Sequence, residues 1–540
     1  MSDINTPLLS VNDLRITLPD GAERPHAIEN VSFHLNAGEV LCIVGESGSG
    51  KSMIANALLG LLPKPHVMVD KGTVVFQEQS LLELDEPDLQ RVRGKEISMI
   101  FQEPMTALNP VMRIDLQIEE VFMAHGIGSK AKRKQAVLKL LREVNLPDPE
   151  AIGKSFPFKL SGGQRQRVMI AMALALEPKI LIADEPTTAL DVTTQAQILT
   201  LISDLQKKRG MGVIFITHDL GVVAEIADRI MVLRKGKVVE DGSANEILRN
   251  PQHPYTQELI ASVPRLVANN RSDKDNKPIV LKVDGLNKEF RDSGGLFRKG
   301  RVTHAVDDVS FVLRQGETLG VVGESGSGKS TLSRCMTKLL VPNSGGIQFH
   351  GEDLLQLNGV ELRQHRKRVQ MIFQDPYASL NPRRTIGQTI ADGPIAYGSS
   401  KAEAMEKTLE LLEITGLDKG AADRFPHEFS GGQRQRVGLA RALALEPEVL
   451  IADEPVSALD VSVQAKVLDL LENLMEKLEF AMIFVTHDLR VAARICDRIA
   501  VMQRGKVIEI GRTEQVLFTP EHEYTQRLLA AVPGRNWRAQ

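Results

Sequence analysis

The sequence repeats itself in two halves, and this repeat constrains the possible folds more than any other feature. The octapeptide GESGSGKS occurs at residues 45–52 and again at residues 323–330, an offset of 278 residues. Three later motifs recur in the same order at a constant offset of 269 residues: SGGQRQRV at Ser161 and Ser430, IADEP at Ile182 and Ile451, and THDL at Thr217 and Thr486. A fixed order at a fixed spacing indicates a tandem duplication. Each half is therefore expected to fold as a copy of one domain.

The duplication also predicts where the chain divides. Both halves close with related segments, HPYTQELIASVP from His253 and HEYTQRLLAAVP from His522. The polar stretch after the first segment predicts a flexible linker over residues 266–278, between domains of residues 1–265 and 279–540. Two domains agree with the length of 540 residues, which exceeds what one core usually supports. The first half has nine more residues between GESGSGKS and SGGQ, where features specific to one half are expected.

Composition narrows the classes of function. The residues are 42% hydrophobic and 25% charged, as in ordinary globular proteins, and the net charge of -3 gives no electrostatic reason to expect nucleic acid as the main partner. Three scattered cysteines predict neither a disulfide framework nor a four-ligand metal site. The longest apolar stretch, residues 168–176, is about half the length that crosses a bilayer. We therefore expect a cytosolic protein with no membrane span and no signal sequence.

Local patterns predict three kinds of layer in each half. Alternating apolar residues over 8–14 and 280–286 predict strands of a small β layer. Short apolar runs before GESGSGKS and within ILIADEP and VLIADEP predict buried strands of an α/β core. Helical periodicity over residues 131–144 and 402–414, between the glycine loop and SGGQ, predicts a helical subdomain inserted into that core.

Each GESGSGKS lies between a predicted strand and a predicted helix, the context that a phosphate-binding loop requires. Glycines let main-chain N–H groups converge on phosphate, the lysine neutralises the β and γ oxygens, and the last serine reaches Mg²⁺. A glycine-rich turn with an incidental lysine could explain one copy, but not two in matched context. The expected ATP-binding residues are Gly45, Glu46, Ser47, Gly48, Ser49, Gly50, Lys51 and Ser52, and Gly323, Glu324, Ser325, Gly326, Ser327, Gly328, Lys329 and Ser330.

An acidic pair ends the second apolar strand of each half. An aspartate at the carboxyl end of a buried strand can organise Mg²⁺, which assigns Asp184 and Asp453 to the metal. The adjacent glutamate can orient and polarise the attacking water, which assigns Glu185 and Glu454 to catalysis. An acidic pair taken alone is more often a solvated strand end. Its recurrence after a phosphate loop in each half favours the catalytic interpretation.

The segments LSGGQRQRV and FSGGQRQRV resemble the signature of the ABC family of ATPases. Taken alone, they could also be helix N-caps before an arginine-rich exposed face. The resemblance implies tandem P-loop NTPase domains of α/β class, each a RecA-like core with an antiparallel β subdomain and an inserted helical subdomain. It also implies that each signature binds the γ-phosphate held by the opposite domain, so Lys51 would share a site with Ser430, and Lys329 with Ser161. The signature residues are Ser161, Gly162, Gly163 and Gln164, and Ser430, Gly431, Gly432 and Gln433.

Further segments resemble the remaining motifs of this family. Gln102 and Gln374, in FQEP and FQDP, resemble the Q-loop glutamine, which senses Mg²⁺ and the attacking water and lies near the transmembrane partner. A single histidine after an apolar strand is usually structural, but its recurrence at a fixed distance from the acidic pair favours function. The D-loop aspartates would be Asp191 and Asp460, and the switch histidines that contact the γ-phosphate would be His218 and His487.

Two features depart from the family pattern. Family members usually stack adenine on an aromatic residue near the end of the first strand, where the second half has Phe290 but the first has Leu18. A weaker adenine contact is therefore expected in the first half. Many peptide-importer ATPases with similar tails also carry a cysteine-rich segment for an iron–sulfur cluster. This chain lacks those cysteines, so no cluster is expected, and the cofactors are expected to be ATP and Mg²⁺.

The tails and the fused halves resemble the oligopeptide and dipeptide importer ATPases, in the branch of Yej-type peptide importers and the glutathione importer. This resemblance implies an ATP-hydrolysing motor at the cytoplasmic face of a bacterial inner membrane. Its implied partners are two integral-membrane permease subunits and a periplasmic substrate-binding protein, with no nucleic acid. The alternative is a soluble twin ATPase acting on ribosomes or nucleic acid. Such proteins usually have a long charged linker, zinc motifs or coiled-coil insertions, none of which is visible here.

Overall fold

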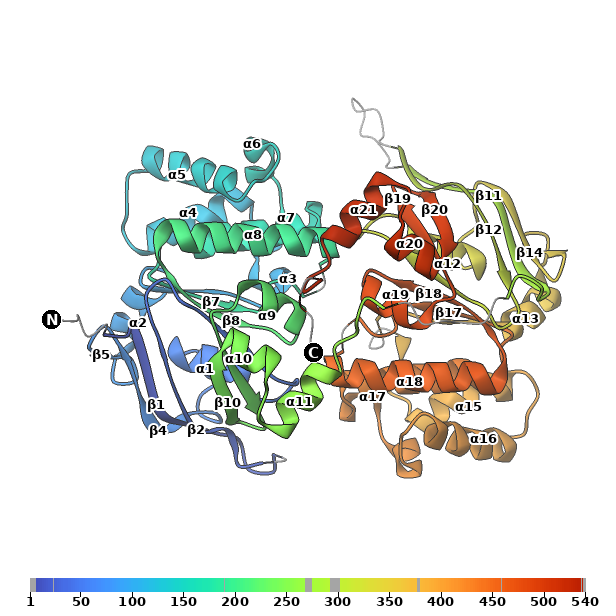
Figure 1. Ribbon diagram of the computed structural model, residues 1–540, viewed down its shortest axis with the longest axis horizontal. Helices are drawn as coiled ribbons and strands as arrows, with labels where there is room; N and C mark the ends of the chain where they lie inside the picture. The colour runs from blue at the N-terminus through green and yellow to red at the C-terminus, as the bar shows by residue number, and fades with distance from the viewer. Residues whose placement is uncertain are drawn as a thin grey trace.

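The computed structural model describes residues 6–22, 24–188, 190–267, 274–291, 302–375, 379–457, 459–535 and 537. Two halves with matching sheets and helices lie side by side (Figure 1). This confirms the tandem α/β fold class expected from the repeat. Residues 268–273 of the expected linker lie outside the described residues, so the linker and the domain limits stay predictions.

A six-stranded sheet forms the core of the first half, in the order β10-β9-β3-β8-β7-β6. All neighbouring strands are parallel except β10 on β9. Helices cover both faces of such a sheet, so its central strands are unbroken apolar runs, as the sequence predicted. The strands are β3 (Val40–Val44), β6 (Ile97–Ile100), β7 (Ile180–Asp184), β8 (Gly212–Ile216), β9 (Arg229–Arg234) and β10 (Lys237–Ser243).

The helices of this core follow its strands. The phosphate loop leads from β3 into α1 (Lys51–Leu58), and β7 leads towards the long helix α8 (Val192–Arg209). Strand β8 is followed by the short helix α9 (Leu220–Ile226). The closing segment forms α10 (Ala244–Arg249) and α11 (Pro254–Ala261).

An antiparallel sheet in the order β2-β1-β4-β5 lies beside the core and confirms the predicted β layer. Buried and exposed residues alternate along much of these strands, because one face packs on α1 and the core while the other meets solvent. Its strands are β1 (Leu9–Thr17), β2 (His26–Leu35), β4 (Val69–Phe76) and β5 (Gln79–Ser80). Helix α2 (Glu86–Val92) connects this sheet to β6.

The predicted helical subdomain lies between β6 and β7. The periodic segment 131–144 forms α5, which buries Val137, Leu140 and Leu141 against its neighbours. The helices are α3 (Pro104–Ala107), α4 (Ile114–Ala124), α5 (Lys130–Glu143), α6 (Pro149–Gly153) and the signature helix α7 (Gly162–Ala173). Helix α7 contacts both the subdomain and the core, so it joins the two.

The second half repeats this plan. Its core sheet has the order β16-β17-β18-β13-β19-β20, and its antiparallel sheet the order β12-β11-β14-β15. The core strands are β13 (Thr318–Val322), β16 (Val369–Ile372), β17 (Val449–Asp453), β18 (Ala481–Thr486), β19 (Arg498–Gln503) and β20 (Lys506–Arg512). The outer strands are β11 (Ile279–Arg291), β12 (Val302–Arg314), β14 (Ser344–Phe349) and β15 (Glu352–Asp353).

The helices of the second half also follow those of the first. They are α12 (Lys329–Met336), α13 (Gly359–Arg368), α15 (Ile386–Ala396), α16 (Lys401–Ile414), α17 (Gly431–Leu443), α18 (Val461–Leu478), α19 (Leu489–Ile495), α20 (Thr513–Phe518) and α21 (Glu523–Ala530). The periodic segment 402–414 forms α16, as predicted. Most of the extra length of the first half lies between α1 and the end of β4, and the rest is spread in small steps.

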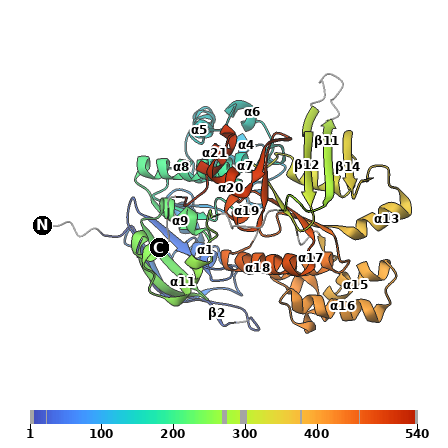
Figure 2. The ribbon, with the colours of Figure 1, turned by 45° about the vertical axis from the view of Figure 1, so that its right-hand side comes forward.

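The halves pack head to tail. In Figure 1 the first helical subdomain lies at the top left and the second at the bottom right, and Figure 2 shows the same separation after rotation. Helix α11 contacts α18, and α21 contacts α8, so the closing segment of each half lies on the other. Leu266 packs in the apolar cluster of the second half, and Trp537 in that of the first. Among the described residues, no helix is both long and apolar enough to span a bilayer.

Candidate functional site

The two phosphate loops adopt a conformation that depends on glycine. Gly45 and Gly50 have φ values of 153° and 106°. A Cβ atom at Gly45 would lie 2.2 Å from the carbonyl oxygen of Leu233, and one at Gly50 would lie 2.8 Å from that of Ala27. Both distances are far below van der Waals contact, so only glycine fits. The second loop has the same geometry at Gly323 and Gly328.

Buried donors gather in each loop. Lys51 Nζ donates to the main-chain oxygens of Gly45 and Glu46 at 2.7 and 3.0 Å, and Lys329 makes the matching bonds at 2.7 and 2.9 Å. Burial lowers the pKa of both lysines, although nearby carboxylates oppose the shift. The buried hydroxyls of Ser49 and Ser327 have no hydrogen-bond partner among the described residues. Unpaired buried donors beside an amine fit the phosphate oxygens of a nucleotide.

The last loop serine of each half meets the strand-end aspartate. Ser52 Oγ donates to Asp184 Oδ1 at 3.1 Å, and Ser330 Oγ donates to Asp453 Oδ1 at 3.2 Å. Burial raises the pKa of both aspartates. A hydroxyl and a carboxylate at the edge of a phosphate site are ligands that suit Mg²⁺. The side chains that the sequence assigned to the metal therefore lie together, while metal binding itself stays a prediction.

Each strand-end glutamate lies at the centre of a hydrogen-bond network. Glu185 Oε2 accepts from Gln102 Nε2 and Thr188 Oγ1, both at 2.9 Å, and Glu185 Oε1 lies 3.2 Å from His218 Nδ1. Burial acts to raise the pKa of Glu185, but His218, Thr188 and Lys51 outweigh it and hold the pKa at about 2. The glutamate is therefore ionised at neutral pH.

The second network repeats the first with one difference. Glu454 Oε2 accepts from Gln374 Nε2 at 3.0 Å, and Glu454 Oε1 lies 3.4 Å from His487 Nδ1. Burial acts to raise the pKa of Glu454, but His487 and its other partners outweigh it and lower that pKa. Ser457 donates to the main-chain oxygen of Glu454, whereas Thr188 in the first half donates to a carboxylate. The two glutamates thus differ in one hydrogen bond.

Both histidines are poised to carry charge. Burial acts to lower the pKa of His218 and of His487, but the adjacent glutamate in each half outweighs this and raises the pKa above the ordinary value. Protonated imidazole donates a charge-assisted hydrogen bond to carboxylate and leaves its second N–H for another acceptor. A phosphate oxygen could accept the hydrogen bond from this second N–H.

The signature segments begin helices α7 and α17. Ser161 Oγ accepts from Gln164 N, and Gln164 Oε1 accepts from Ser161 N, a reciprocal cap that Ser430 and Gln433 repeat. A Cβ at Gly432 would lie 2.5 Å from Val463 Cγ1, so the second glycine of the motif packs on the next helix. In contrast, a Cβ at Gly431 would meet nothing within 4 Å. The first glycine is therefore open to a ligand.

The D-loop region of each half contacts the phosphate loop of the other. Asp191 Oδ2 accepts from Ser325 N at 3.4 Å, and Thr193 Oγ1 donates to Glu324 Oε1 at 2.6 Å. Ser462 Oγ donates to Glu46 Oε1 at 2.5 Å across the other contact. Asp460 lies close enough to Lys51 for its charge to favour the protonated amine, as Asp191 does for Lys329. Each phosphate loop thus faces the opposite half.

The register of the outer sheets supports the comparison of Leu18 with Phe290. Thr17 pairs with His26, and Glu289 pairs with His304, so the next residues, Leu18 and Phe290, are equivalent. Leu18 packs partly against the core, whereas Phe290 is 44% exposed. Only the second half presents an exposed aromatic ring at this position.

Sequence reasoning missed several contacts of the site. The hydroxyl of Tyr255 accepts from Glu46 N, and that of Tyr524 accepts from Glu324 N, both at 3.2 Å. These tyrosines belong to the closing segments HPYTQ and HEYTQ, so their recurrence was a signal that the sequence offered. The role of Thr188 beside Glu185 had no comparable signal.

Comparisons with known proteins agree with this geometry. The profile of the family described as ABC transporter matches residues 28–188 and 306–457, and that of the oligopeptide/dipeptide transporter C-terminal region matches residues 239–295 and 508–540. The chain is 47% identical to the peptidoglycan transport ATP-binding protein YejF of Agrobacterium fabrum, over 98% of this chain and 97% of that one. It is 46% identical to the glutathione import ATP-binding protein GsiA of Salmonella typhimurium, over 97% and 89% of the two chains. The chain therefore belongs to the ABC transporter family, as a fused pair of ATP-binding domains with ATPase activity.

Proposed function

We propose that this chain is the motor of a bacterial importer for short peptides or solutes that contain them. The observation that carries the proposal is the match of both closing segments to the oligopeptide/dipeptide transporter C-terminal region. The two relatives are named for peptidoglycan transport and for glutathione import, and both of these solutes contain amide-linked amino acids. Both relatives are therefore named for the transport of peptide-like solutes.

The ATP sites in this proposal are composite. Lys51 would act with Ser430, and Lys329 with Ser161, which the contacts between each phosphate loop and the opposite D-loop region support. Mg²⁺ would supply charge neutralisation at the phosphates when bound. Its ligand groups would come from Ser52, Gln102 and Asp184, and from Ser330, Gln374 and Asp453.

Glu185 and Glu454 would position the attacking water. A carboxylate with a pKa of about 2 is a weak base, so Glu185 would orient and polarise the water more than deprotonate it. His218 and His487 would use their free N–H groups on the γ-phosphate. Phe290 would stack on adenine in the second site, with a weaker contact at Leu18 in the first.

Coupling to transport would pass through the helical subdomains. Apolar side chains beside the Q-loops are exposed, with Phe101 42%, Met105 49% and Phe373 37% accessible. Gln102 and Gln374 connect these surfaces to the catalytic glutamates. We propose that two permease subunits dock there, at the cytoplasmic face of the inner membrane. A periplasmic substrate-binding protein would deliver the cargo, and no residue of this chain would contact it.

Three experiments test the proposal. Purification of the tagged chain from membranes should recover two integral-membrane proteins, and the reconstituted complex should hydrolyse ATP faster with peptides or glutathione plus the binding protein. Recovery of ribosomes without any membrane protein would contradict it. The Glu185→Gln, Glu454→Gln double variant should bind ATP but lose steady-state turnover. Substantial turnover in that variant would reject the assignment of the two glutamates.

A further inference from the structure

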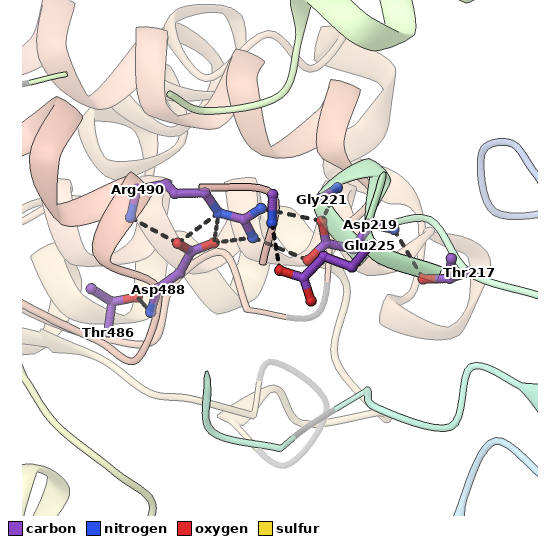
Figure 3. A network of polar contacts seen from close by, with 8 residues as sticks. Thr217, Asp219, Gly221, Glu225, Thr486, Asp488 and Arg490 are labelled. Carbon is purple, nitrogen blue, oxygen red and sulfur yellow. Dashed lines mark hydrogen bonds and ion pairs between the residues drawn. The ribbon is translucent and has the colours of Figure 1, made fainter. Parts of the chain in front are cut away.

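Arg490 lies at the interface of the two halves and contacts an aspartate from each (Figure 3). Its Nε and Nη2 donate to Asp488 Oδ1 and Oδ2 at 3.1 and 2.9 Å. Its Nη1 and Nη2 donate to Asp219 Oδ1 and Oδ2 at 3.2 and 3.1 Å. The side chain of Arg490 is only 13% exposed. One largely buried guanidinium therefore makes paired hydrogen bonds to carboxylates of both halves.

The two aspartates directly follow the switch histidines in the chain. Asp219 N donates to Thr217 Oγ1 at 3.1 Å, and Asp219 Oδ1 accepts from Gly221 N at 2.8 Å. His218 is thus held between two residues whose positions are fixed. Asp488 makes the same pair of bonds, to the threonine before its own histidine and to the second residue after itself. A displacement of either aspartate would move the histidine beside it.

This bridge is asymmetric although the sequence is duplicated. Gly221 occupies the position in the first half that Arg490 occupies in the second, at the offset of 269 residues. A Cβ at Gly221 would lie 2.7 Å from Pro533 O and 2.8 Å from Arg490 Nη1. A second arginine would therefore collide with the first. The glycine gives the single guanidinium room to reach both aspartates.

The charges around Arg490 explain why a cation is favourable at this position. Asp219 and Asp488 approach each other from opposite halves, and Glu225 lies close by, its Oε1 accepting from Gly534 N at 3.1 Å. Burial acts to raise the pKa of Asp219, but Arg490 outweighs it and lowers that pKa. Without the guanidinium, two largely buried carboxylates would face one another with no cation between them, which is unfavourable. Asp219 and Asp488 would then move apart or take up protons.

A cavity between the halves connects this bridge with both catalytic networks. Its lining includes His218, His487 and Arg490, together with Thr188 and Ser457 beside the catalytic glutamates. The bridge thus lies between the two histidine loops.

We propose that Arg490 is a positioning residue that ties the loop of His218 to the loop of His487, so that each ATP site responds to the state of the other. Movement of one histidine towards or away from its γ-phosphate is transmitted through its aspartate, the shared guanidinium and the opposite aspartate. The inference rests on the ATPase activity of the chain and is independent of the cargo. Absence of stimulation by peptides would reject the proposed cargo and leave this inference unaffected.

The test uses the full chain and measures kcat, KM and the Hill coefficient for ATP. The wild type should show a Hill coefficient above 1. Arg490→Gln should bring the coefficient close to 1 and lower kcat several-fold, with KM for ATP changed less than kcat because the phosphate loops are untouched. Arg490→Lys should recover only part of the cooperativity, since an ammonium cannot form paired bonds with two carboxylates.

Two further variants separate coupling from stability. Asp219→Asn keeps the size of the side chain and leaves the ion pair between Arg490 and Asp488 intact. It replaces Arg490→Gln in the test if that variant does not fold, and it should also lower the Hill coefficient. Arg494→Gln is the matched control, because Arg494 lies on the same helix and binds Asp469 and Glu472 within the second half. It should keep wild-type cooperativity. A folded Arg490→Gln or Asp219→Asn variant with the wild-type Hill coefficient would overturn the proposal, as would a wild type without cooperativity.

Discussion

Two glycines of the signature helix α17 should respond in opposite ways to the same added methyl group. A Cβ at Gly432 would lie 2.5 Å from Val463 Cγ1 and 3.3 Å from Leu459 Cδ2. At Gly438, six residues further along α17, a Cβ would meet nothing within 4 Å. The equivalent residue of the first half is Met169, so this position accepts a larger side chain in the same fold.

These distances set the expected changes in the free energy of unfolding. Val463 lies in a helix, where a β-branched side chain has one strongly preferred rotamer and cannot easily turn away. Overpacking at Gly432→Ala should therefore cost about 1–3 kcal/mol. Gly438→Ala lies in a helix interior and should gain about 0.5–1 kcal/mol from reduced backbone freedom in the unfolded chain. At Gly163 in the first half, the neighbour at 2.5 Å is Thr194 Cγ2, and threonine has a second accessible rotamer, so Gly163→Ala should cost less than Gly432→Ala.

Differential scanning calorimetry on the full chain gives the direct measurement. For a domain of this size, about 1 kcal/mol shifts the melting temperature by roughly 2–4 °C. Gly438→Ala should raise the transition of the second half and keep ATPase activity. Gly432→Ala should lower the transition and also reduce kcat, because it displaces the signature serine from its place at the start of α17. The reasoning would be refuted if Gly432→Ala melted at or above the temperature of Gly438→Ala.

Three other predictions concern the ion pair at Glu185, the phosphate loop and the adenine contact. The folded pKa of Glu185 is lowered from 4.5 to about 2, so its contribution to stability is present above pH 4.5 and is lost as the pH falls through about 2. His218 has a raised pKa, so its contribution is complete below pH 6.5 and is lost as the pH rises through the folded pKa. The free energy of unfolding of the wild type should therefore exceed that of His218→Ala most between about pH 4.5 and 6.5, by no more than about 3 kcal/mol. Urea unfolding at several pH values measures this difference. A difference that does not change with pH would contradict the ion pair. Tyr255→Phe removes the hydroxyl that accepts a hydrogen bond from a phosphate-loop N–H, and it should destabilise that loop by about 1–3 kcal/mol. The expected result is a several-fold higher KM for ATP. An unchanged KM would show that the bond is dispensable. Phe290→Ala should weaken binding of a fluorescent ATP analogue several-fold and Leu18→Phe should strengthen it, whereas equal affinities would reject the stacking role.

Much of the fold could be predicted because the relevant signals are short-range. The strand before each GESGSGKS and the helix after it are set by local apolar runs and by glycines with positive φ. Helices α5 and α16 follow from periodicity within single segments. The grouping of Lys51, Asp184 and Glu185 followed from the repeated order of motifs. The exchange of closing segments between halves was not predicted, because nothing local tells Trp537 which apolar cluster it will enter.

The sequence by itself determined that this chain is a duplicated ATPase and which residues gather around its two phosphate loops. Tertiary structure alone decided which of two similar glycines is obstructed, that Tyr255 supports a phosphate loop, and that Gly221 makes room for Arg490. The physical reason is the range of the forces involved. Backbone conformation and periodicity act within a few residues. Steric fit depends on atoms from different elements, such as Gly432 on α17 and Val463 on α18, and the contacts of Tyr255 and Arg490 join positions more than two hundred residues apart.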